Sequence, residues 1–347
     1  MFLSYIHNLR GVAILFIVAS HCFGVFDWSE SPWAFRILDV VTTNGTVMFV
    51  FISGFLFQYL STRFSYRRYL SAKFRYVILP YLIISVPAIA FRLVAHSEIN
   101  GLTEAFYEEN SPLAQILWFL ATGAHLGPLW FIPVIALFYV IAPALVWLDR
   151  DRRIYWLLPL LIVAGSFVHR PLWNVDPFHA FLHLLPAYMA GMFASRYREE
   201  LYGILVPRIG LLALLWGGLT LFHILFVDYT GIIYVTQMFG PGSAAVEWTY
   251  FQKLILCALL MVAFRKWERY LPHHLLDDLA TYSFSIYFLH GYLTLTAARI
   301  VEWENLSIPG NSLGFVAVVL VITGICVLFA KTVKLLTGQR SRLLVGS

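Results

Sequence analysis

Two ionisable residues, Arg10 and His21, occupy the first long apolar stretch of the 347-residue chain. Ionisable groups within such stretches are costly and are therefore candidates for functional sites. Eleven residues at about 100° each place both side chains on one helix face, roughly 16 Å apart along the axis. A histidine can take a proton from an alcohol, and an arginine can bind an anion. The spacing fits equally well an arginine that reaches the membrane surface and a hydrogen-bonded core histidine.

A second histidine, His290, lies in a later apolar stretch, in the sequence YSFSIYFLHGY. Ser283, Tyr287 and His290 follow one another at i, i+4 and i+7, which predicts one polar stripe on an otherwise apolar helix. We place the start of this helix near residue 279 on the cytoplasmic side, so His290 lies at the depth of His21. Two histidines at one depth, on helices that could be neighbours, indicate a site.

A basic segment, RFSYRRYLSAKFRYVILPY, carries five positive charges and no acidic residue. One interpretation is that Arg68, Lys73 and Arg75 bind the phosphates of a soluble donor on the cytoplasmic side. The alternative is that the segment only determines topology and contacts lipid headgroups.

The remaining candidate ligands do not predict a metal site. His179 and His183 have the i, i+4 spacing of metal ligands, but no third ligand accompanies them, which favours a polar face or a contact with an acceptor. Cys22, Cys257 and Cys326 all lie in apolar stretches, which argues against a disulfide framework or zinc.

The composition indicates the elements that must position these residues. Hydrophobic residues make up 60% of the chain, charged residues 12%, and the mean hydropathy is +0.75, which excludes a soluble globular fold. We therefore predict an all-α, polytopic integral membrane protein. The net charge of +5 needs no nucleic acid, because the basic residues cluster between apolar stretches. About ten transmembrane helices are expected, near residues 9–26, 38–60, 76–95, 128–148, 154–170, 178–195, 208–228, 249–265, 279–300 and 312–333.

The positions of the basic residues give this arrangement an orientation. With ten spans and a cytoplasmic start, most Lys and Arg residues fall on the cytoplasmic side, together with both termini. An eleventh span at 111–127 would place the later basic clusters outside. We therefore expect 111–127 to be re-entrant or to lie along one surface. The whole chain, 1–347, is expected to be a single transmembrane domain with no appended soluble domain.

Five motifs, in order along the chain, give it a resemblance to a known family. They are YIHNLRGVAILFIVASH, MFVFISGFLF, RRYLSAKFRYVILPY, LWFIPVIALFYVIAP and YSFSIYFLH. Together they resemble the membrane-bound acyltransferase-3 family of surface-glycan O-acyltransferases, and the arginine before the first histidine is the most specific match. The residues that carry the resemblance include Arg10, His21, Ser53, Trp130, Phe131, Tyr139 and His290.

The resemblance implies transfer of an acyl group from cytoplasmic acyl-CoA to a hydroxyl of a cell-surface or secreted polysaccharide, in the inner or plasma membrane of a bacterium. His21 would be catalytic with Arg10 as its partner, and Arg68, Lys73 and Arg75 would bind the donor. Ser53, Trp130, Tyr139, Ser283, Tyr287 and His290 would support the site. Acyl-CoA is expected as a co-substrate, with no permanently bound cofactor and no metal. Acetyl is the default acyl group, because no carboxylate clamp or long donor slot is evident.

Three questions stay open at this point. The histidines could instead relay protons in a secondary transporter, although no internal repeat supports that class. The acceptor could be a lipid or a protein, and a glycan acceptor could be free or a lipid-linked saccharide. His21 could act as a general base or could take the acyl group itself.

Overall fold

The computed structural model describes residues 3–96, 101–238 and 245–346. Nearly all regular structure in these ranges is helical, and the two named strands, β1 (Arg170–Pro171) and β2 (Tyr234–Val235), form one short parallel pair. The prediction of an all-α membrane fold is confirmed at the level of its class.

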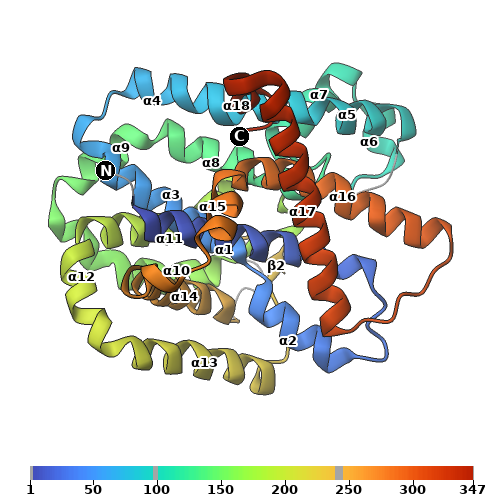
Figure 1. Cartoon of the computed structure of the whole chain (residues 1–347). Helices are drawn as coiled ribbons and strands as arrows, with labels where there is room; N and C mark the ends of the chain where they lie inside the picture. Colours follow the sequence, from blue (N-terminus) through green and yellow to red (C-terminus); the bar gives the residue numbers. More distant parts are fainter. Residues whose placement is uncertain (1–2, 97–100, 239–244, 347) are drawn as a thin grey trace.

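Helix α1 (Ser4–Ser20) lies at the centre of the molecule (Figure 1). It contacts α2 (Pro32–Thr42), α3 (Gly45–Leu60), α14 (Trp248–Lys266), α15 (His273–Thr281), α16 (Ser283–Trp303) and α17 (Ser312–Thr337). Its apolar residues are buried on several sides, because helices surround it. Any polar group on α1 therefore lies within reach of several other segments.

The closest helix contact joins α3 to α11 (Pro177–Arg196). A Cβ atom on Gly54 would lie 2.0 Å from the Tyr188 carbonyl oxygen, and one on Gly191 would lie 1.9 Å from that of Phe51. Only glycine permits two helix backbones to approach this closely. The Ser-Gly-Phe motif at residues 53–55 therefore has a packing role, which fixes the position of Ser53.

Within the described residues, six helical segments are long and apolar enough to cross a membrane: Ser4–Val25, Pro32–Leu60, Tyr66–Ala95, Arg198–Phe226, Trp248–Lys266 and Ser312–Leu344. The number is up to seven if one bent pair is included, so the expected count of ten is not confirmed. Three of the expected spans, 154–170, 178–195 and 279–300, are among those outside this set. One of them contains α10 (Leu158–Val168), only 11 residues long. The others contain α11 and α16, whose polar side chains include His183 and His290.

The segment at 111–127 belongs to the bent pair. Helix α7 (Pro112–Thr122) is followed by a break and then by Gly127–Trp130 and α8 (Phe131–Val140), with a bend of 75°. A bend of this size is typical of a broken span or a re-entrant loop, and a re-entrant segment is one of the two arrangements that the sequence predicts. The break brings Gly127 and Trp130 next to the end of α1, where both line a cavity with His21.

The remaining helices are α4 (Tyr66–Lys73), α5 (Leu79–Ala95), α6 (Glu104–Glu109), α9 (Ala142–Asp149), α12 (Arg198–Leu205), α13 (Ile209–Phe226) and α18 (Ser341–Leu344). Some of them belong to the apolar segments above: α4 and α5 to Tyr66–Ala95, α12 and α13 to Arg198–Phe226, and α18 to Ser312–Leu344.

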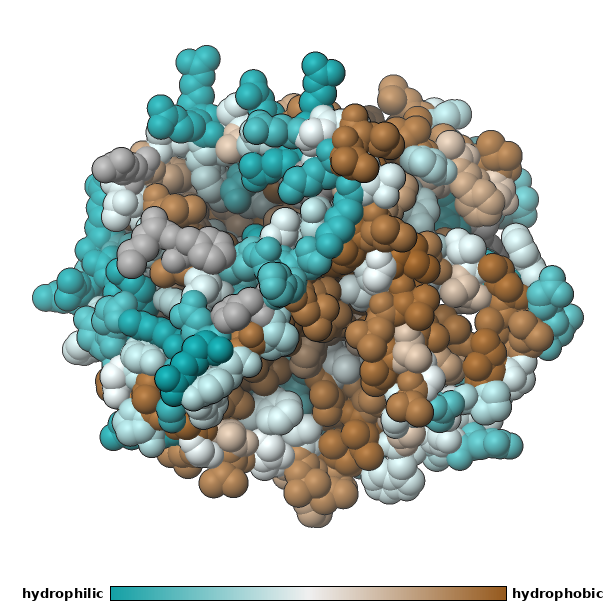
Figure 2. Space-filling model, viewed as in Figure 1, coloured by the Kyte–Doolittle hydropathy of each residue, from teal (hydrophilic) through white to brown (hydrophobic). Residues whose placement is uncertain are grey.

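The surface separates into polar and apolar parts. In the view of Figure 2, hydrophilic residues gather at the left and upper left, and hydrophobic residues cover the region over α17. Leu313, Leu320 and Leu328 of α17 are among its exposed side chains. Apolar side chains on an outer helix face fit a lipid environment. The orientation with both termini in the cytoplasm stays a prediction.

Candidate active site

The two histidines singled out in the sequence lie next to each other. The ring centroids of His21 and His290 are 5.1 Å apart, and the rings are nearly perpendicular. Helix α1 begins at Ser4, earlier than the expected residue 9, and ends at Ser20, so His21 directly follows it. Arg10 lies about two turns into the same helix, toward its other end.

The hydrogen bonds of both rings define which nitrogen carries the proton. His21 Nδ1 is 2.8 Å from the carbonyl oxygen of Ile17, and His290 Nδ1 is 2.9 Å from that of Ile286. A carbonyl oxygen only accepts hydrogen bonds, so each neutral ring donates from Nδ1 and keeps a lone pair on Nε2. This is the tautomer that a general base or a nucleophile requires.

A cavity of about 350 Å³, which we call the polar cavity, lies beside His21. Its walls combine hydroxyl, amide, carboxylate and aromatic side chains. They include Ser20, His21, Phe23, Phe35, Asp39, Thr43, Asn44, Thr46, Trp130, Arg170, Asn174, Thr230 and Tyr234. Of the supporting residues expected from the sequence, only Trp130 lines this cavity. Several of the other residues come from segments that the sequence analysis did not connect with His21.

Arg170 is the most notable residue that sequence reasoning missed. Its Nη2 donates to Asn44 Oδ1 at 2.8 Å, and its guanidinium carbon lies 4.7 Å from the Trp130 ring centroid. Arg170 is 3% exposed, and its Nε has no hydrogen-bond partner among the described residues. A signal was present, because an arginine at the edge of an expected span is a functional candidate.

A buried acidic residue, Glu247, lies near this arginine and is linked to it through Asn44. Asn44 Nδ2 donates to Glu247 Oε1 at 2.6 Å, so Asn44 bridges Arg170 and Glu247. Burial raises the pKa of Glu247 to about 7, although the charge of Arg170 acts in the opposite direction. His183 Nε2 lies 3.9 Å from Glu247 Oε1. The bridge through Asn44 therefore holds Arg170 against the polar cavity.

His179 and His183 contribute to this buried region as hydrogen-bonded core residues. His179 contacts the Val168 carbonyl oxygen at 2.9 Å, and His183 contacts that of Gly165 at 3.1 Å. In the part of the chain that the structure describes, no three His, Cys, Asp or Glu side chains are grouped in a way that could hold a metal ion.

A second region, at the Arg10 end of α1, contains two adjacent cavities. The first, which we call the basic cavity, has a volume of about 500 Å³ and is lined by four cations: Arg10, Lys73, Lys334 and Arg342. No carboxylate is among its lining residues. The second, the inner cavity, has a volume of about 360 Å³ and shares Arg10 and Lys73 with the first.

The inner cavity contains two more of the residues expected from the sequence. Ser53 and Tyr139 line it, together with Phe49 and Tyr188. The Nζ atom of Lys73 lies 4.9 Å from the Tyr139 ring centroid. Apolar and aromatic walls are suited to an uncharged arm, whereas the basic cavity is suited to an anion.

The structure distinguishes the three predicted donor-binding residues. Lys73 lines both cavities, at the point where α4 passes into a π-helical turn, Phe74–Ile78. Arg68 and Arg75 are exposed and line neither of these two cavities. The structure therefore brings only Lys73 of the three to these cavities, while Arg68 and Arg75 lie on exposed faces of the helix. Binding of the donor by all three residues stays a prediction.

Arg10 is held by a chain of side chains that the sequence analysis did not single out. Its Nη2 lies 3.3 Å from His7 Nδ1, and His7 Nε2 lies 2.9 Å from Asp277 Oδ1. The arginine donates to Nδ1, so the proton of His7 lies on Nε2 and is donated to Asp277.

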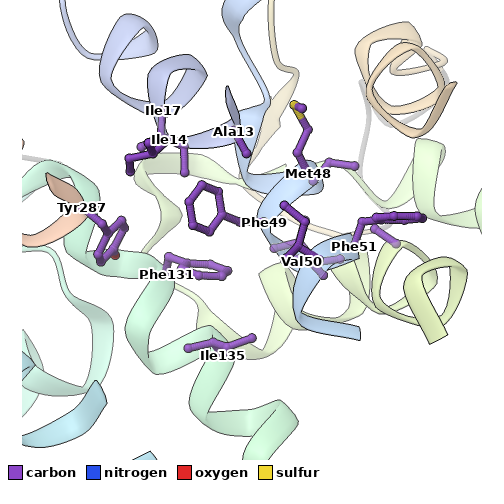
Figure 3. Close-up of a cluster of buried hydrophobic side chains, with 14 of the residues drawn as sticks. Ala13, Ile14, Ile17, Met48, Phe49, Val50, Phe51, Phe131, Ile135 and Tyr287 are labelled. Atoms are coloured by element: carbon purple, nitrogen blue, oxygen red, sulfur yellow. The ribbon is translucent and has the colours of Figure 1, made fainter. Parts of the chain in front are cut away.

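An apolar layer separates the two regions. Figure 3 shows Phe49 between Ile14 and Ile17 of α1 and Phe131 of α8. Ile17 lines the polar cavity and Phe49 lines the inner cavity, so the layer between them is thin.

The other predicted supporting residues lie within the protein interior. Tyr287 is part of the cluster in Figure 3 and donates from its hydroxyl to the Pro128 carbonyl oxygen at 2.6 Å, which ties α16 to the segment after α7. Ser283 is buried and donates to the Ala280 carbonyl oxygen at 2.9 Å. The predicted stripe on α16 therefore divides: Tyr287 and His290 approach the site, and Ser283 stabilises the start of the helix.

His21 lines the polar cavity and contacts His290, and the basic cavity lies toward the other end of α1. A comparison with family models matches residues 3–331 to the acyltransferase domain of the acyltransferase-3 family. None of the curated proteins or solved structures compared with the chain gives a significant match. The chain therefore belongs to the membrane acyltransferase-3 family and is an acyltransferase enzyme in a multi-pass membrane fold.

Proposed function

We propose that this enzyme transfers an acyl group, acetyl by default, from cytoplasmic acyl-CoA to a hydroxyl of a cell-surface or secreted polysaccharide. One observation carries the proposal. Helix α1 holds Arg10 at the basic cavity and His21 at the polar cavity, toward its opposite ends. An acyl donor and an alcohol acceptor that approach from opposite ends would meet at His21.

The basic end has the chemistry that an acyl-CoA donor requires. Four cations without a carboxylate attract the phosphates of the nucleotide. The inner cavity, with its aromatic walls, suits the uncharged arm that carries the thioester. Acyl-CoA would act as a co-substrate that enters and leaves, with no cofactor bound permanently.

The polar cavity has the chemistry that a saccharide acceptor requires. Asp39, Asn44 and Asn174 offer hydrogen-bond partners for hydroxyl groups, and Trp130 offers an aromatic face. A purely apolar lipid acceptor would leave these groups unsatisfied. The cavity therefore favours a glycan or a lipid-linked saccharide. Family membership favours the enzyme over a proton-coupled transporter.

The proposed reaction uses the lone pair on His21 Nε2. The imidazole takes the proton of the acceptor hydroxyl as its oxygen attacks the thioester carbonyl. The carbon–sulfur bond then breaks, and the departing thiolate takes the proton from the imidazolium. The products are an O-acyl ester and CoA. If His21 instead takes the acyl group first, Nε2 bonds to the carbonyl carbon as the carbon–sulfur bond breaks. The acceptor oxygen then displaces Nε2 from that carbon, and the hydroxyl proton passes to the thiolate.

Arg170 and His290 would assist this reaction from two sides. Arg170 offers an unpaired Nε–H to the oxyanion that forms at the carbonyl oxygen. His290 Nε2 is buried without a hydrogen-bond partner among the described residues, so it can accept a hydrogen bond from the protonated His21 ring. Both residues would act most strongly when charge develops.

The proposal is tested with the full chain in lipid nanodiscs. Labelled acetyl-CoA is supplied, envelope glycan from a strain that lacks the protein is the acceptor, and mass spectrometry locates the new ester. We expect acetyl esters on the glycan with wild type and a loss of at least about a hundredfold with His21→Ala. Label in lipid alone would show a lipid acceptor. Normal transfer by His21→Ala would overturn the proposed mechanism.

The proposed orientation is tested separately. Cysteines introduced in place of Ser29 and Arg340 report which end of the molecule faces the cytoplasm. In cells whose inner membrane is intact, we expect a membrane-impermeant thiol reagent to label the cysteine at position 29. The cysteine at position 340 should be labelled only after lysis. The reverse pattern would contradict a cytoplasmic donor site.

A further inference from the structure

The last residues of the described chain turn back into the molecule. Helix α17 ends at Thr337, and Gly338 adopts a φ of 58°, a left-handed conformation that favours glycine. The chain reverses there and continues into α18, which contacts α5. Figure 1 shows α18 at the top of the molecule, next to the C-terminus.

Specific contacts hold this tail, which we define as residues 338–346. Ser285 Oγ of α16 donates to the Val345 carbonyl oxygen at 2.8 Å. Val345 is 5% exposed, and Ser341 is 1% exposed. Gly346 packs against Phe284 and Phe288. Buried anchors at both ends of α18 indicate a fixed position rather than a loose end.

The fixed tail places positive charge at the basic cavity. Arg342 and Gly346 line the cavity together with Lys334 of α17 and Arg10 of α1. The guanidinium carbon of Arg342 lies 4.7 Å from the ring centroid of Tyr76, which lines the same cavity. Half of the four cations at this cavity therefore come from the last part of the chain.

We propose that the tail completes the donor site and that Arg342 and Lys334 bind phosphate groups at the nucleotide end of acyl-CoA. The inference rests on the proposed function. Arg342 presents a planar fork that matches a phosphate, and Lys334 adds a point charge. Both residues lie beyond residue 331, where the match to the family model ends, so they add to this chain's donor site from outside the matched region.

The test compares two acyl donors that differ only in the nucleotide. Acetyl-CoA carries the phosphates, and acetyl-pantetheine carries the same thioester arm without the nucleotide. We expect Arg342→Gln to raise the KM for acetyl-CoA about tenfold, in line with the loss of a charge-assisted hydrogen bond. The KM for acetyl-pantetheine and the kcat with either donor stay unchanged. The double variant with Lys334→Gln shows a larger rise.

Arg340→Gln is the matched control. Arg340 belongs to the same tail, is exposed, and is not among the residues that line the basic cavity. The Arg340→Gln substitution removes the same charge two residues away from Arg342. A loss of general electrostatic attraction would therefore raise the KM equally in both variants. Binding of CoA in the absence of acceptor, measured by calorimetry in nanodiscs, gives a readout that does not depend on turnover.

The outcomes separate this inference from the proposed function. If wild type uses acetyl-CoA and Arg342→Gln matches Arg340→Gln in KM and in CoA binding, the role of the tail is overturned and the proposed function stands. An equal rise in KM for both donors would show a structural role only and would also overturn it. If wild type neither binds CoA nor transfers acetyl from it, the proposed function and the inference both fail.

Discussion

The two ends of α1 handle charge in opposite ways. The basic cavity at the Arg10 end collects cations and contains no carboxylate, so its charge is left for a ligand to neutralise. In the polar cavity at the His21 end, Arg170 is already linked through Asn44 to the buried Glu247. The first arrangement attracts a polyanion, whereas the second orients a neutral molecule and holds one donor ready for a charge that forms only during reaction.

This difference explains why an apolar layer separates the two ends. A continuous polar channel would admit water, which competes with the acceptor hydroxyl for the thioester. Phe49, Ile14 and Ile17 occupy the region between the inner and polar cavities (Figure 3). Under the proposed function, the reacting carbonyl would pass this layer while the nucleotide stays at the basic end.

The largest effect is expected at His21, the residue that joins both halves of the reaction. His21→Ala removes the proposed base, and we expect kcat to fall by roughly 10² to 10⁴. CoA binding should be unchanged, because the donor phosphates lie at the other end of α1. Transfer assays and calorimetry on the same nanodisc sample measure both quantities. A variant that also loses CoA binding would contradict the separation of the two ends.

Arg170 should produce the next largest effect, confined to the polar end. We expect Arg170→Gln to lower kcat by roughly 10² to 10³, because a preorganised donor to the oxyanion is lost. The double variant Arg170→Gln with Glu247→Gln removes the opposite buried charge as well and restores stability without restoring kcat. Melting temperature and transfer rate distinguish these contributions. Recovery of the rate in the double variant would show that Arg170 acts only through packing.

Residues close to one helix can be related from the sequence. Arg10 lies in α1 and His21 is the residue that caps it, so periodicity predicts their relative position. The contact between His21 and His290 requires only that their two helices be neighbours. In the structure, the centroids of the two rings are 5.1 Å apart. The all-α membrane class followed from composition, because the solvent of such a chain is lipid.

The polar cavity could not be assembled from the sequence. Asn44, Trp130 and Arg170 come from an interhelical break, a bent helix pair and a two-residue strand, and no periodic pattern brings such segments together. The basic segment shows a second limit of sequence reasoning. Its charge density indicated a donor site, but only the rotation of the helix decides that Lys73 lines the cavities and Arg68 does not. The count of ten spans is not confirmed, because the segments that contain α10, α11 and α16 are not among those long and apolar enough to cross a membrane.

Substitutions at the basic end of α1 should have a smaller effect on the reaction than those at the polar end. Lys73 and Arg68 of α4 allow a direct comparison of a residue that lines the cavities with one that does not. Lys73→Gln should raise the KM for acetyl-CoA about tenfold, because a half-buried cation that lines both the basic and the inner cavity is lost. The exposed Arg68 contributes only screened attraction, so Arg68→Gln should raise the KM by less. Initial rates at several donor concentrations and two salt concentrations measure both. An equal or larger effect of Arg68→Gln would show that the donor binds over the outer face of α4.

The smallest effect is expected for the apolar layer between the two ends of α1. It should appear as a change in the ratio of acetyl-CoA hydrolysis to acetyl transfer. Phe49→Leu shortens a side chain that lines the inner cavity, so we expect a few-fold rise in the hydrolysis of acetyl-CoA relative to transfer. Phe51→Leu is the matched control, because Phe51 is buried in the same helix and does not line that cavity. Both variants lose the same atoms from the core, so a loss of packing affects them alike. Released thiol and labelled ester are counted in one reaction. If the ratio changes equally in both variants, the separation of donor and acceptor does not depend on Phe49, and loosening of α3 as a whole accounts for the leak.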